Sequence, residues 1–395
     1  MKKLTSIVLA LLLCAAALPV KAHAAPESIN VYNWGQYISD GTDGSLDVNK
    51  AFTEATGIEV NYMTFDSNES LYTKLKTGGS AYDVIIPSDY MIARLIAEDM
   101  LLPLDFENIP NYQYIDESYR NTAYDPDNAY SVPYTWGTVG VIYNSAYVDE
   151  ADVGSWELLW NSKYAGKILM FDNPRDSFGI AETMLGYDLN TTDESELRAA
   201  SYKLIEQKPL VQGYVMDQIY DKMERGEAWI APYYAGDYLM MAEENEDLKF
   251  FFPSEGYNLF IDAMCIPTCA QNKSGAEAYI NFLCSPEVSG QNLEYLGYST
   301  PESAAKEYMS PEVAESDISY PDAETLSRGG SFLYLPTAAN QLMDSLWLGV
   351  KTDGGVEWTP IIGIGVFVLA VGVYLLGRRI HTKRRKAARC KKWHS

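Results

Sequence analysis

The sequence predicts an α/β protein built as two lobes, and two observations carry this prediction. Residues 25–357 form a segment of 333 residues, which is more than one hydrophobic core usually organises. Short apolar strands also alternate with helical stretches, which is typical of layered α/β folds with largely parallel sheets. Ligands bind such sheets at the carboxyl ends of the strands. The predicted strands are residues 29–34, 58–63, 82–87 and 167–171, and the predicted helices are residues 46–56, residues 70–77 and one that Ser88 caps.

The amino-terminal residues 1–24 read as a secretory signal peptide. Lys2 and Lys3 precede an apolar run over residues 4–18, and Ala22-His23-Ala24 supplies small residues at a cleavage site. The apolar run is short for a retained membrane helix, which is the alternative. Cys14 does not indicate a lipoprotein, because the bulky Leu13 precedes it.

The carboxyl-terminal residues predict a membrane anchor. Residues 361–377 carry no charge, and with the flank from Trp358 they reach across a hydrocarbon core, so residues 358–377 are expected to form a transmembrane helix. The tail, residues 378–395, is rich in Lys and Arg and is expected inside the cell, which places the preceding chain outside. Residues 349–357 read as a stalk. The alternatives are a buried helix or a cell-wall sorting signal, but no LPxTG motif precedes the segment.

Charge and histidine content limit the function of the exterior part. Residues 25–357 contain all 54 acidic residues and 18 of the 30 basic ones, a net charge of −36, which repels nucleic acid and attracts cations. All three histidines lie outside this part. A Ser-His-Asp or Cys-His mechanism and a His-ligated metal site are therefore excluded there. Cys265, Cys269 and Cys284 form no disulfide framework and are expected to be buried small side chains.

Aromatic residues gather at the predicted strand ends. The chain contains 30 Tyr, against 12 Phe and 8 Trp. Several aromatics lie beside turn residues and not inside apolar runs, and these are Trp34, Tyr37, Tyr90, Tyr233, Tyr234, Phe260 and Tyr298. Any one of them alone is more simply explained as core or surface. Their grouping at strand ends of a very acidic chain favours a binding site.

The sequence also contains a series of motifs in a recognisable order. They include NVYNWGQYI, YDVIIPSDY, YSVPYTWGTVGVIYN, FIDAMCIP, LGYSTP and YPDAETL, between about residues 29 and 328. In this order they resemble the spermidine/putrescine-binding proteins of ABC importers, of the extracellular solute-binding protein family. The resemblance implies a two-lobed periplasmic-binding-protein-like (type II) clamshell with a crossing hinge. Lobe 1 would comprise residues 25–135 and 262–300, and lobe 2 residues 136–261 and 301–348.

The resemblance also nominates ligand-binding residues. They are Trp34, Tyr37, Ser88, Tyr90, Asn173, Asp176, Tyr234, Phe260, Asp262 and Tyr298. Tyr234 and Phe260 stand where the family usually has Trp. Asn173 occupies a position that often holds a second acid, and the segment after Gly330 lacks an expected polar contact. With one carboxylate fewer, a diamine becomes a candidate ligand beside three-amine spermidine.

The chemistry of a polyamine fits these residues. Each buried ammonium needs a carboxylate partner, and the methylenes between ammonium groups need apolar or aromatic walls. Asp262 and Asp176 would form the two ends, although Asp176 could instead cap a helix. The expected protein is a non-catalytic monomer without a cofactor, whose partners are a polyamine, an ABC permease and its ATPase. The alternatives are the same fold with another solute, such as a metal or other cation, and a carboxylate-dependent surface glycosidase.

Overall fold

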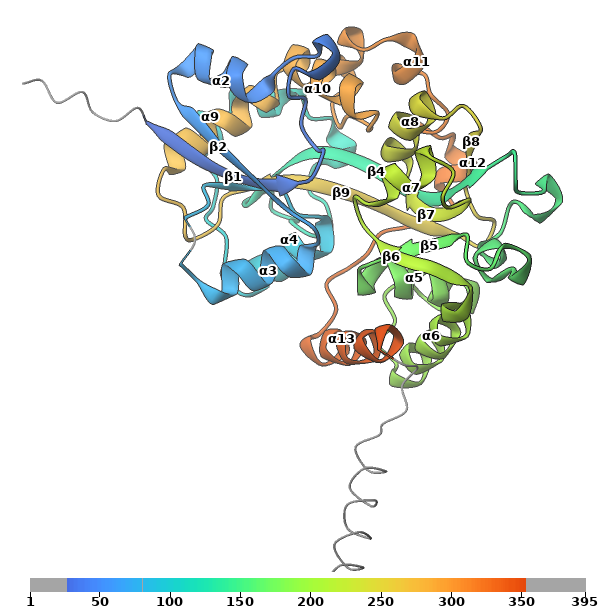
Figure 1. The fold of residues 1–395 in the computed structure, drawn as a ribbon. Helices are drawn as coiled ribbons and strands as arrows, with labels where there is room; N and C mark the ends of the chain where they lie inside the picture. Colours follow the sequence, from blue (N-terminus) through green and yellow to red (C-terminus); the bar gives the residue numbers. More distant parts are fainter. Residues whose placement is uncertain (1–26, 80, 353–395) are drawn as a thin grey trace, which may run out of the picture.

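The computed structural model describes residues 27–79 and 81–352 and shows a mixed α/β fold (Figure 1). Its strands are β1 (Ser28–Trp34), β2 (Glu59–Phe65), β3 (Val84–Ile85), β4 (Ser131–Asn144), β5 (Ile168–Phe171), β6 (Val211–Val215), β7 (Ile230–Tyr234), β8 (Leu248–Phe251), β9 (Tyr257–Cys265) and β10 (Gly329–Gly330). They form one sheet in the order β2-β1-β3-β9-β4-β7-β5-β6, with β10 beside β9 and β8 beside β4.

The helices cover both faces of this sheet (Figure 1). They are α2 (Val48–Thr56), α3 (Asn68–Thr77), α4 (Asp89–Ala97), α5 (Pro174–Met184), α6 (Glu194–Gln207), α7 (Ile219–Glu224), α8 (Ala235–Glu244), α9 (Lys273–Leu283), α10 (Pro286–Leu296), α11 (Pro311–Ala314), α12 (Ala323–Leu326) and α13 (Thr337–Lys351). We call β1–β3 with α2, α3, α4, α9 and α10 the first lobe, and β5–β8 with α5–α8 and α13 the second lobe.

Strands β4 and β9 cross from one lobe to the other (Figure 1). The first part of β4 pairs with β9, and its last six residues, 139–144, pair with β7 and β8. Every residue of β4 is buried, so this strand belongs to the core of both lobes. Thr135 pairs with Asp262 and Trp136 with Ile261, so the residues at the predicted lobe boundaries face each other on neighbouring strands. The boundaries themselves stay a prediction.

Most of the predicted elements are present, and the differences have local causes. The Asp47 side chain caps α2 and Gly57, at φ 78°, ends it, while Ser67 begins α3 with a capping box. The predicted strand 82–87 shrinks to the two residues of β3. Strand β1 pairs parallel with β2 and β3, and β5 pairs parallel with β6 and β7. Strand β4, however, pairs antiparallel with β7 and β9. The prediction of largely parallel sheets is therefore only partly correct.

Four predictions about the chain ends fall wholly or largely outside the described residues. The predicted signal peptide, transmembrane helix and basic tail lie there entirely. The predicted stalk begins inside α13, which continues to Lys351, and its residues from 353 onward also lie outside. Between residues 27 and 352, the structure contains no helix with the length and apolar character that a membrane crossing needs. Cys265, Cys269 and Cys284 are free, and the first and last of them are buried.

Gly140 lies on β4 just after the strand changes its partner from β9 to β7, where it pairs with Tyr233. A Cβ at this position would clash with the Phe250 ring and lie 2.7 Å from the Phe251 carbonyl oxygen. We predict that Gly140→Ala lowers the free energy of unfolding by about 1–3 kcal/mol, because the buried strands must move apart. Gly213→Ala is the matched control, since nothing lies within 4 Å of a Cβ on that strand glycine. Equal thermal unfolding midpoints for the two variants would contradict the prediction.

Candidate functional site

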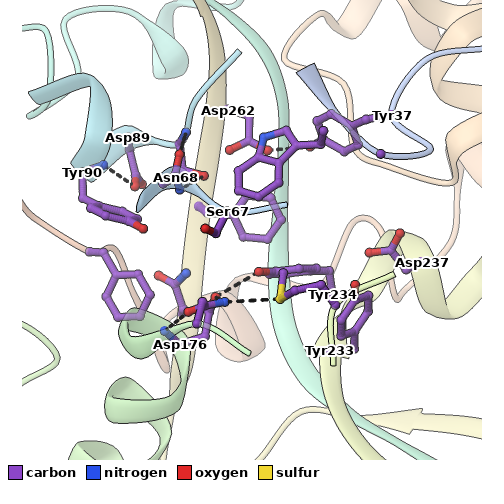
Figure 2. A pocket seen from close by; sticks show the side chains of 18 of the residues that line it. Tyr37, Ser67, Asn68, Asp89, Tyr90, Asp176, Tyr233, Tyr234, Asp237 and Asp262 are labelled. Carbon is purple, nitrogen blue, oxygen red and sulfur yellow. Dashed lines mark hydrogen bonds between the residues drawn. The ribbon is translucent and has the colours of Figure 1, made fainter. Parts of the chain in front are cut away.

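A cleft lies between the two lobes and encloses about 700 Å³, its open mouth included. All ten residues predicted from the sequence line it: Trp34, Tyr37, Ser88, Tyr90, Asn173, Asp176, Tyr234, Phe260, Asp262 and Tyr298. In Figure 2, Tyr37, Asp89, Tyr90 and Asp262 come from one side of the cleft, and Asp176, Tyr234 and Asp237 come from the other. The fold therefore brings together residues that are far apart in the sequence.

The predicted residues reach the cleft because they lie at the ends of elements or on the crossing strand. Trp34 is the last residue of β1, Tyr234 is the last residue of β7, and Phe260 and Asp262 belong to β9. The others lie at helix ends or in the following loops: Tyr37, Ser88, Tyr90, Asn173, Asp176 and Tyr298. Ser88 is the N-cap residue of α4, but its hydroxyl accepts a hydrogen bond from the Asn68 amide (3.0 Å) and does not cap the helix.

Six carboxylates line the cleft. They are Glu69, Asp89, Asp176, Asp217, Asp237 and Asp262, and they come from both lobes. Within the described part of the chain, none of the cleft-lining residues is Lys, Arg or His. Negative charges buried without a counter-charge are costly, so this cleft is prepared for a positively charged ligand.

Asp262 is the carboxylate with the clearest unfilled hydrogen-bonding capacity. Its side chain is only 4% exposed, and its Oδ2 accepts a hydrogen bond from the Tyr37 hydroxyl at 2.7 Å. Its Oδ1 is buried and has no hydrogen-bond partner. Burial, followed by the charges of Asp176 and Asp237, raises its pKa to about 6. An ammonium group at Oδ1 would supply the missing partner.

Asp176 lies on the opposite lobe, in the first turn of α5. The helix is capped by Asn173, whose side chain accepts the Asp176 N–H at 2.8 Å, so the alternative that Asp176 is the cap is wrong. The carboxylate Oδ2 instead accepts hydrogen bonds from the Asn173 amide (2.8 Å) and the Tyr234 hydroxyl (2.9 Å). Burial raises the pKa of Asp176, although these two donors oppose the rise.

The sequence reasoning missed other cleft carboxylates, of which Asp237 and Asp89 are the most perturbed. Asp237, in the first turn of α8, accepts hydrogen bonds from the hydroxyls of Tyr220 and Tyr298 (the latter at 2.6 Å), and burial raises its pKa to about 6. Burial raises the pKa of Asp89 to about 8. Asp89 lies between the predicted Ser88 and Tyr90, and Asp237 lies three residues after Tyr234, so proximity to predicted residues was the available signal.

Aromatic rings form the walls between these carboxylates. The Phe260 ring lies 5.4 Å from the Tyr234 ring and 6.3 Å from the Tyr298 ring, and Tyr37 meets Tyr298 edge-on at 4.9 Å. Glycines make this packing possible. A Cβ at Gly137 would lie 2.7 Å from Phe260 Cζ, and one at Gly236 would lie 2.6 Å from Tyr298 Cγ. The rings offer faces and edges to an apolar chain and attract adjacent cations.

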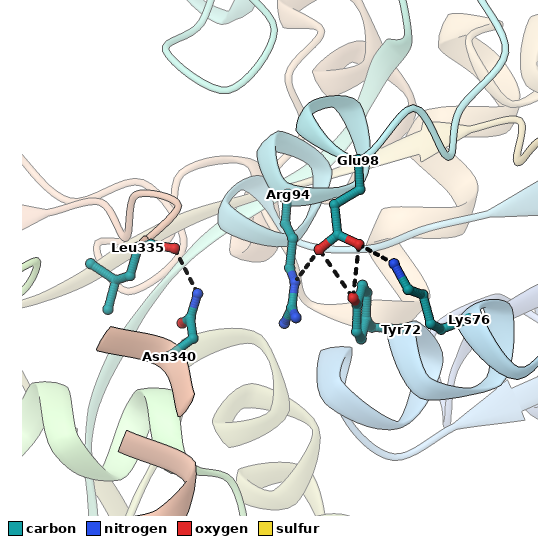
Figure 3. A network of polar contacts seen from close by, with 6 residues as sticks. All are labelled: Tyr72, Lys76, Arg94, Glu98, Leu335 and Asn340. Carbon is teal, nitrogen blue, oxygen red and sulfur yellow. Dashed lines mark hydrogen bonds and ion pairs between the residues drawn. The ribbon is translucent and has the colours of Figure 1, made fainter. Parts of the chain in front are cut away.

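Glu98 lies outside the cleft and is an example of a structural carboxylate that is paired with cations. It accepts hydrogen bonds from Lys76, Arg94 and the Tyr72 hydroxyl (Figure 3). Burial acts to raise its pKa, but these partners outweigh it and lower the pKa to about 2. The cleft carboxylates receive tyrosine and amide donors in place of cations, and their pKa values are raised. Over residues 27–79 and 81–352, moreover, no cluster of His, Cys, Asp and Glu is suited to hold a metal ion.

The raised pKa values predict an unusual dependence of stability on pH. Asp89, Asp237 and Asp262 have pKa values of about 8, 6 and 6 in the fold, against about 3.9 when exposed. The folded state therefore binds more protons than the unfolded state between about pH 4 and 8, so the free energy of unfolding falls as pH rises through this range. We predict a higher unfolding temperature at pH 5.5 than at pH 8 for the ligand-free protein, measured by calorimetry.

The Asp262→Asn variant tests the origin of this dependence. The variant should show a smaller decrease of stability with rising pH, because it lacks the buried Asp262 carboxyl group that must lose its proton. Asp322→Asn is the control, since backbone hydrogen bonds lower the pKa of this carboxyl and it stays ionised throughout the range. An unfolding temperature that rises from pH 5.5 to pH 8 would show that these carboxylates do not control how the stability depends on pH.

Comparisons with known proteins agree with this architecture. Residues 48–321 match the bacterial extracellular solute-binding protein family. The spermidine/putrescine-binding periplasmic protein of Salmonella typhimurium is 37% identical over 80% of this chain and 91% of its own length. The putrescine-binding periplasmic protein SpuD of Pseudomonas aeruginosa is 30% identical over 89% of this chain and 99% of its own.

A solved structure extends this similarity to three dimensions. The putative spermidine/putrescine ABC transporter protein from Listeria monocytogenes superposes with a TM-score of 0.78 at 36% identity, covering 82% of this chain and 99% of that one. The expected periplasmic-binding-protein-like α/β fold is thereby confirmed. The chain belongs to the bacterial extracellular solute-binding protein family and is similar to its spermidine/putrescine-binding members.

Proposed function

We propose that this protein captures a polyamine, putrescine or spermidine, in the cleft between its lobes and delivers it to an ABC transporter. The single observation that carries the proposal is the lining of the cleft. It contains six carboxylates and a wall of aromatic rings, and none of the described residues that line it is basic. A slender chain of ammonium groups and methylenes needs this combination. The same lining opposes an anionic solute.

The ligand would bind by supplying the positive charges and hydrogen-bond donors that the buried carboxylates lack. One ammonium group would pair with Asp262, whose Oδ1 has no partner, and another with Asp176 on the facing lobe. The methylenes between them would lie against Trp34, Tyr234 and Phe260. Because Asp262 lies on the crossing strand β9 beside Ser88 of the first lobe and Asp176 lies on the second lobe, the ligand would hold the two sides of the cleft together and shift the open–closed equilibrium toward the closed form.

The transport role rests on the relatives and on the chain ends. Proteins named for spermidine and putrescine binding match nearly the whole described part of this chain. The closed form would dock on a permease and its ATPase, with no reaction at the cleft. Residues 358–377 would anchor the binding protein to the outer face of the cytoplasmic membrane and keep it near its transporter. The lobes would move about the predicted boundaries in β4 and β9.

Titration calorimetry with putrescine, spermidine and spermine tests the proposal directly. We expect at least one amine to bind with release of protons near pH 6, because an ammonium lowers the raised pKa of Asp262. The affinity should fall as pH decreases from 8 to 5, since the carboxylates must be ionised to pair. Phosphate and glutamate serve as anionic controls. Tight binding of an anion, without response to any amine, would refute the proposed function.

Removal of one carboxylate should weaken the complex strongly. We predict that Asp262→Asn weakens amine binding by about 3 kcal/mol or more, because a buried ammonium loses its charged partner. Asp322→Asn removes an exposed carboxylate at the start of α12 and should leave the affinity unchanged. If the two variants bound the amine equally well, Asp262 could not be the ammonium partner.

The aromatic wall should contribute less than the charge. We predict that Trp34→Ala costs roughly 1–3 kcal/mol of binding free energy through the lost ring contact. The matched variant Trp229→Ala removes a half-buried Trp that stacks on Tyr147 at 4.7 Å and lies outside the cleft lining. Calorimetry of both variants separates the loss of the Trp34 ring contact with the ligand from general effects of removing a Trp. If Trp34→Ala bound the amine as tightly as the wild type, the Trp34 ring would not be part of the binding site.

A further inference from the structure

Each of three parallel strands in the second lobe is followed by a carboxylate that lines the cleft. Strand β5 pairs parallel with β6 and β7, so the three strands have their carboxyl ends on the same side of the sheet, where ligands bind such sheets. Asp176 comes after β5, Asp217 after β6 and Asp237 after β7. Asp217 lies in the turn between β6 and α7 and is the most exposed of the three, so it marks an edge of the cleft.

Asp217 reaches the first lobe and packs on Gly35, the residue after β1. A Cβ on Gly35 would overlap Asp217 Oδ2 and lie 3.2 Å from its Cγ. Gly35 is not among the described glycines with a positive φ, so its backbone alone would accept a larger residue. It is the Asp217 carboxylate that leaves no room for a side chain there. The absence of a side chain at residue 35 therefore allows the two lobes to meet at this point.

The Asp217 carboxylate meets a second negative charge at this edge. Trp34 pairs with Phe65 in the β1–β2 register, so Gly35 and Asp66 lie side by side just beyond the two strands. Burial, followed by the charge of Asp66, raises the pKa of Asp217. In the part of the chain that the structure describes, none of the ion pairs includes Asp217. A cation placed here would therefore relieve the repulsion between carboxylates of facing lobes.

The other carboxylates that line the cleft do not supply this position. Burial raises the pKa of Asp89, and the charge of Asp262 adds to the rise, so these two carboxylates lie together. A tyrosine hydroxyl donates to Glu69 at 2.9 Å, and tyrosine hydroxyls donate to both oxygens of Asp237. Among the described residues, the hydrogen bond that opposes the rise of the Asp217 pKa comes from its own backbone N–H, so its carboxylate remains available to a ligand.

We propose that Asp217 provides a third position for an ammonium group, beside those at Asp262 and Asp176. This role rests on the proposed polyamine function and deepens it, because it distinguishes amines by the number of their charges. A diamine occupies the positions at Asp262 and Asp176, and the third ammonium group of a triamine pairs with Asp217 at the edge of the cleft. Since Asp217 and Gly35 belong to different lobes, this ammonium group also favours the closed form.

Titration calorimetry of Asp217→Asn with spermidine and putrescine tests this position. We expect the variant to bind spermidine about tenfold more weakly than the wild type does, because an ammonium group loses its charged partner. The affinity for putrescine should change by less than about threefold, because a diamine does not use Asp217. Asp221→Asn is the matched control. It removes an exposed carboxylate of α7 that pairs with Arg225 outside the cleft lining, and it should leave both affinities unchanged.

The outcomes of this titration separate the role of Asp217 from the proposed function. An unaltered spermidine affinity in Asp217→Asn, or an equal loss for both amines, would overturn the role of Asp217 and leave the proposed function intact. Wild-type protein that bound putrescine but not spermidine would have the same consequence. If no amine bound to the wild-type protein, the proposed function would fail and the role of Asp217 with it.

A double-mutant cycle tests the contact that places the carboxylate. Gly35→Ala should weaken spermidine binding, because the added methyl group displaces the Asp217 carboxylate. In an Asp217→Ala background the same substitution should have little further effect, since the atoms that it would displace are gone. Gly213→Ala is the control, because a Cβ there meets nothing within 4 Å, and it should leave the affinity unchanged.

Additive effects of Gly35→Ala and Asp217→Ala on spermidine binding would show that the two residues act independently and would overturn the proposed role. Circular dichroism and retained putrescine binding establish that the variants are folded. If Gly35→Ala fails to fold, Asp217→Asn decides alone.

Discussion

The constraint on which this structure depends is the burial of like charges from two lobes in one cleft. Asp262 on the crossing strand β9 faces Asp176 and Asp237 on the second lobe, and after burial the charges of both carboxylates raise the pKa of Asp262 further. Bringing ionised carboxylates this close is unfavourable unless a proton or a cation joins them. Under the proposed function, closure of the lobes and cation binding would be coupled, because a cation that neutralises the cleft would also favour the closed form.

Under the proposed function, the crossing strands would convert this local chemistry into a motion of whole lobes. Asp262 lies on β9 opposite Thr135 of β4, at the place where both strands pass between the lobes. The Tyr37 hydroxyl contacts both Thr135 and Asp262, so hydrogen bonds connect the loop after β1 to the crossing strands. A ligand at Asp262 would thus bind beside the strands about which the lobes would move. Its contacts with Asp176 and Tyr234 would be made on the second lobe.

The sequence was sufficient to bring the nominated residues to one cleft and less so for the sheet, and the role of these residues in ligand binding stays a prediction. All ten nominated residues line the cleft, because motifs at strand ends are local in sequence and their order matches a family. The 14 residues of β4 escaped prediction, since Pro133, Gly137 and Gly140 interrupt the apolar pattern that defines a strand. Asp89 and Asp237 escaped for another reason. An acid in the first turn of a helix is ordinary, and only the fold shows that these two face the cleft.

Tyrosine is abundant here for a reason that the hydrogen bonds make plain. Tyr37 donates to Asp262, Tyr234 to Asp176, Tyr298 to Asp237 and Tyr90 to Glu69. A Lys or Arg at these positions would orient each carboxylate equally well, as at Glu98, but would also neutralise it and compete with a cationic ligand. A phenol hydroxyl supplies the hydrogen bond without the charge, and its ring supplies an apolar wall. The cleft can therefore be rigid and still remain negative.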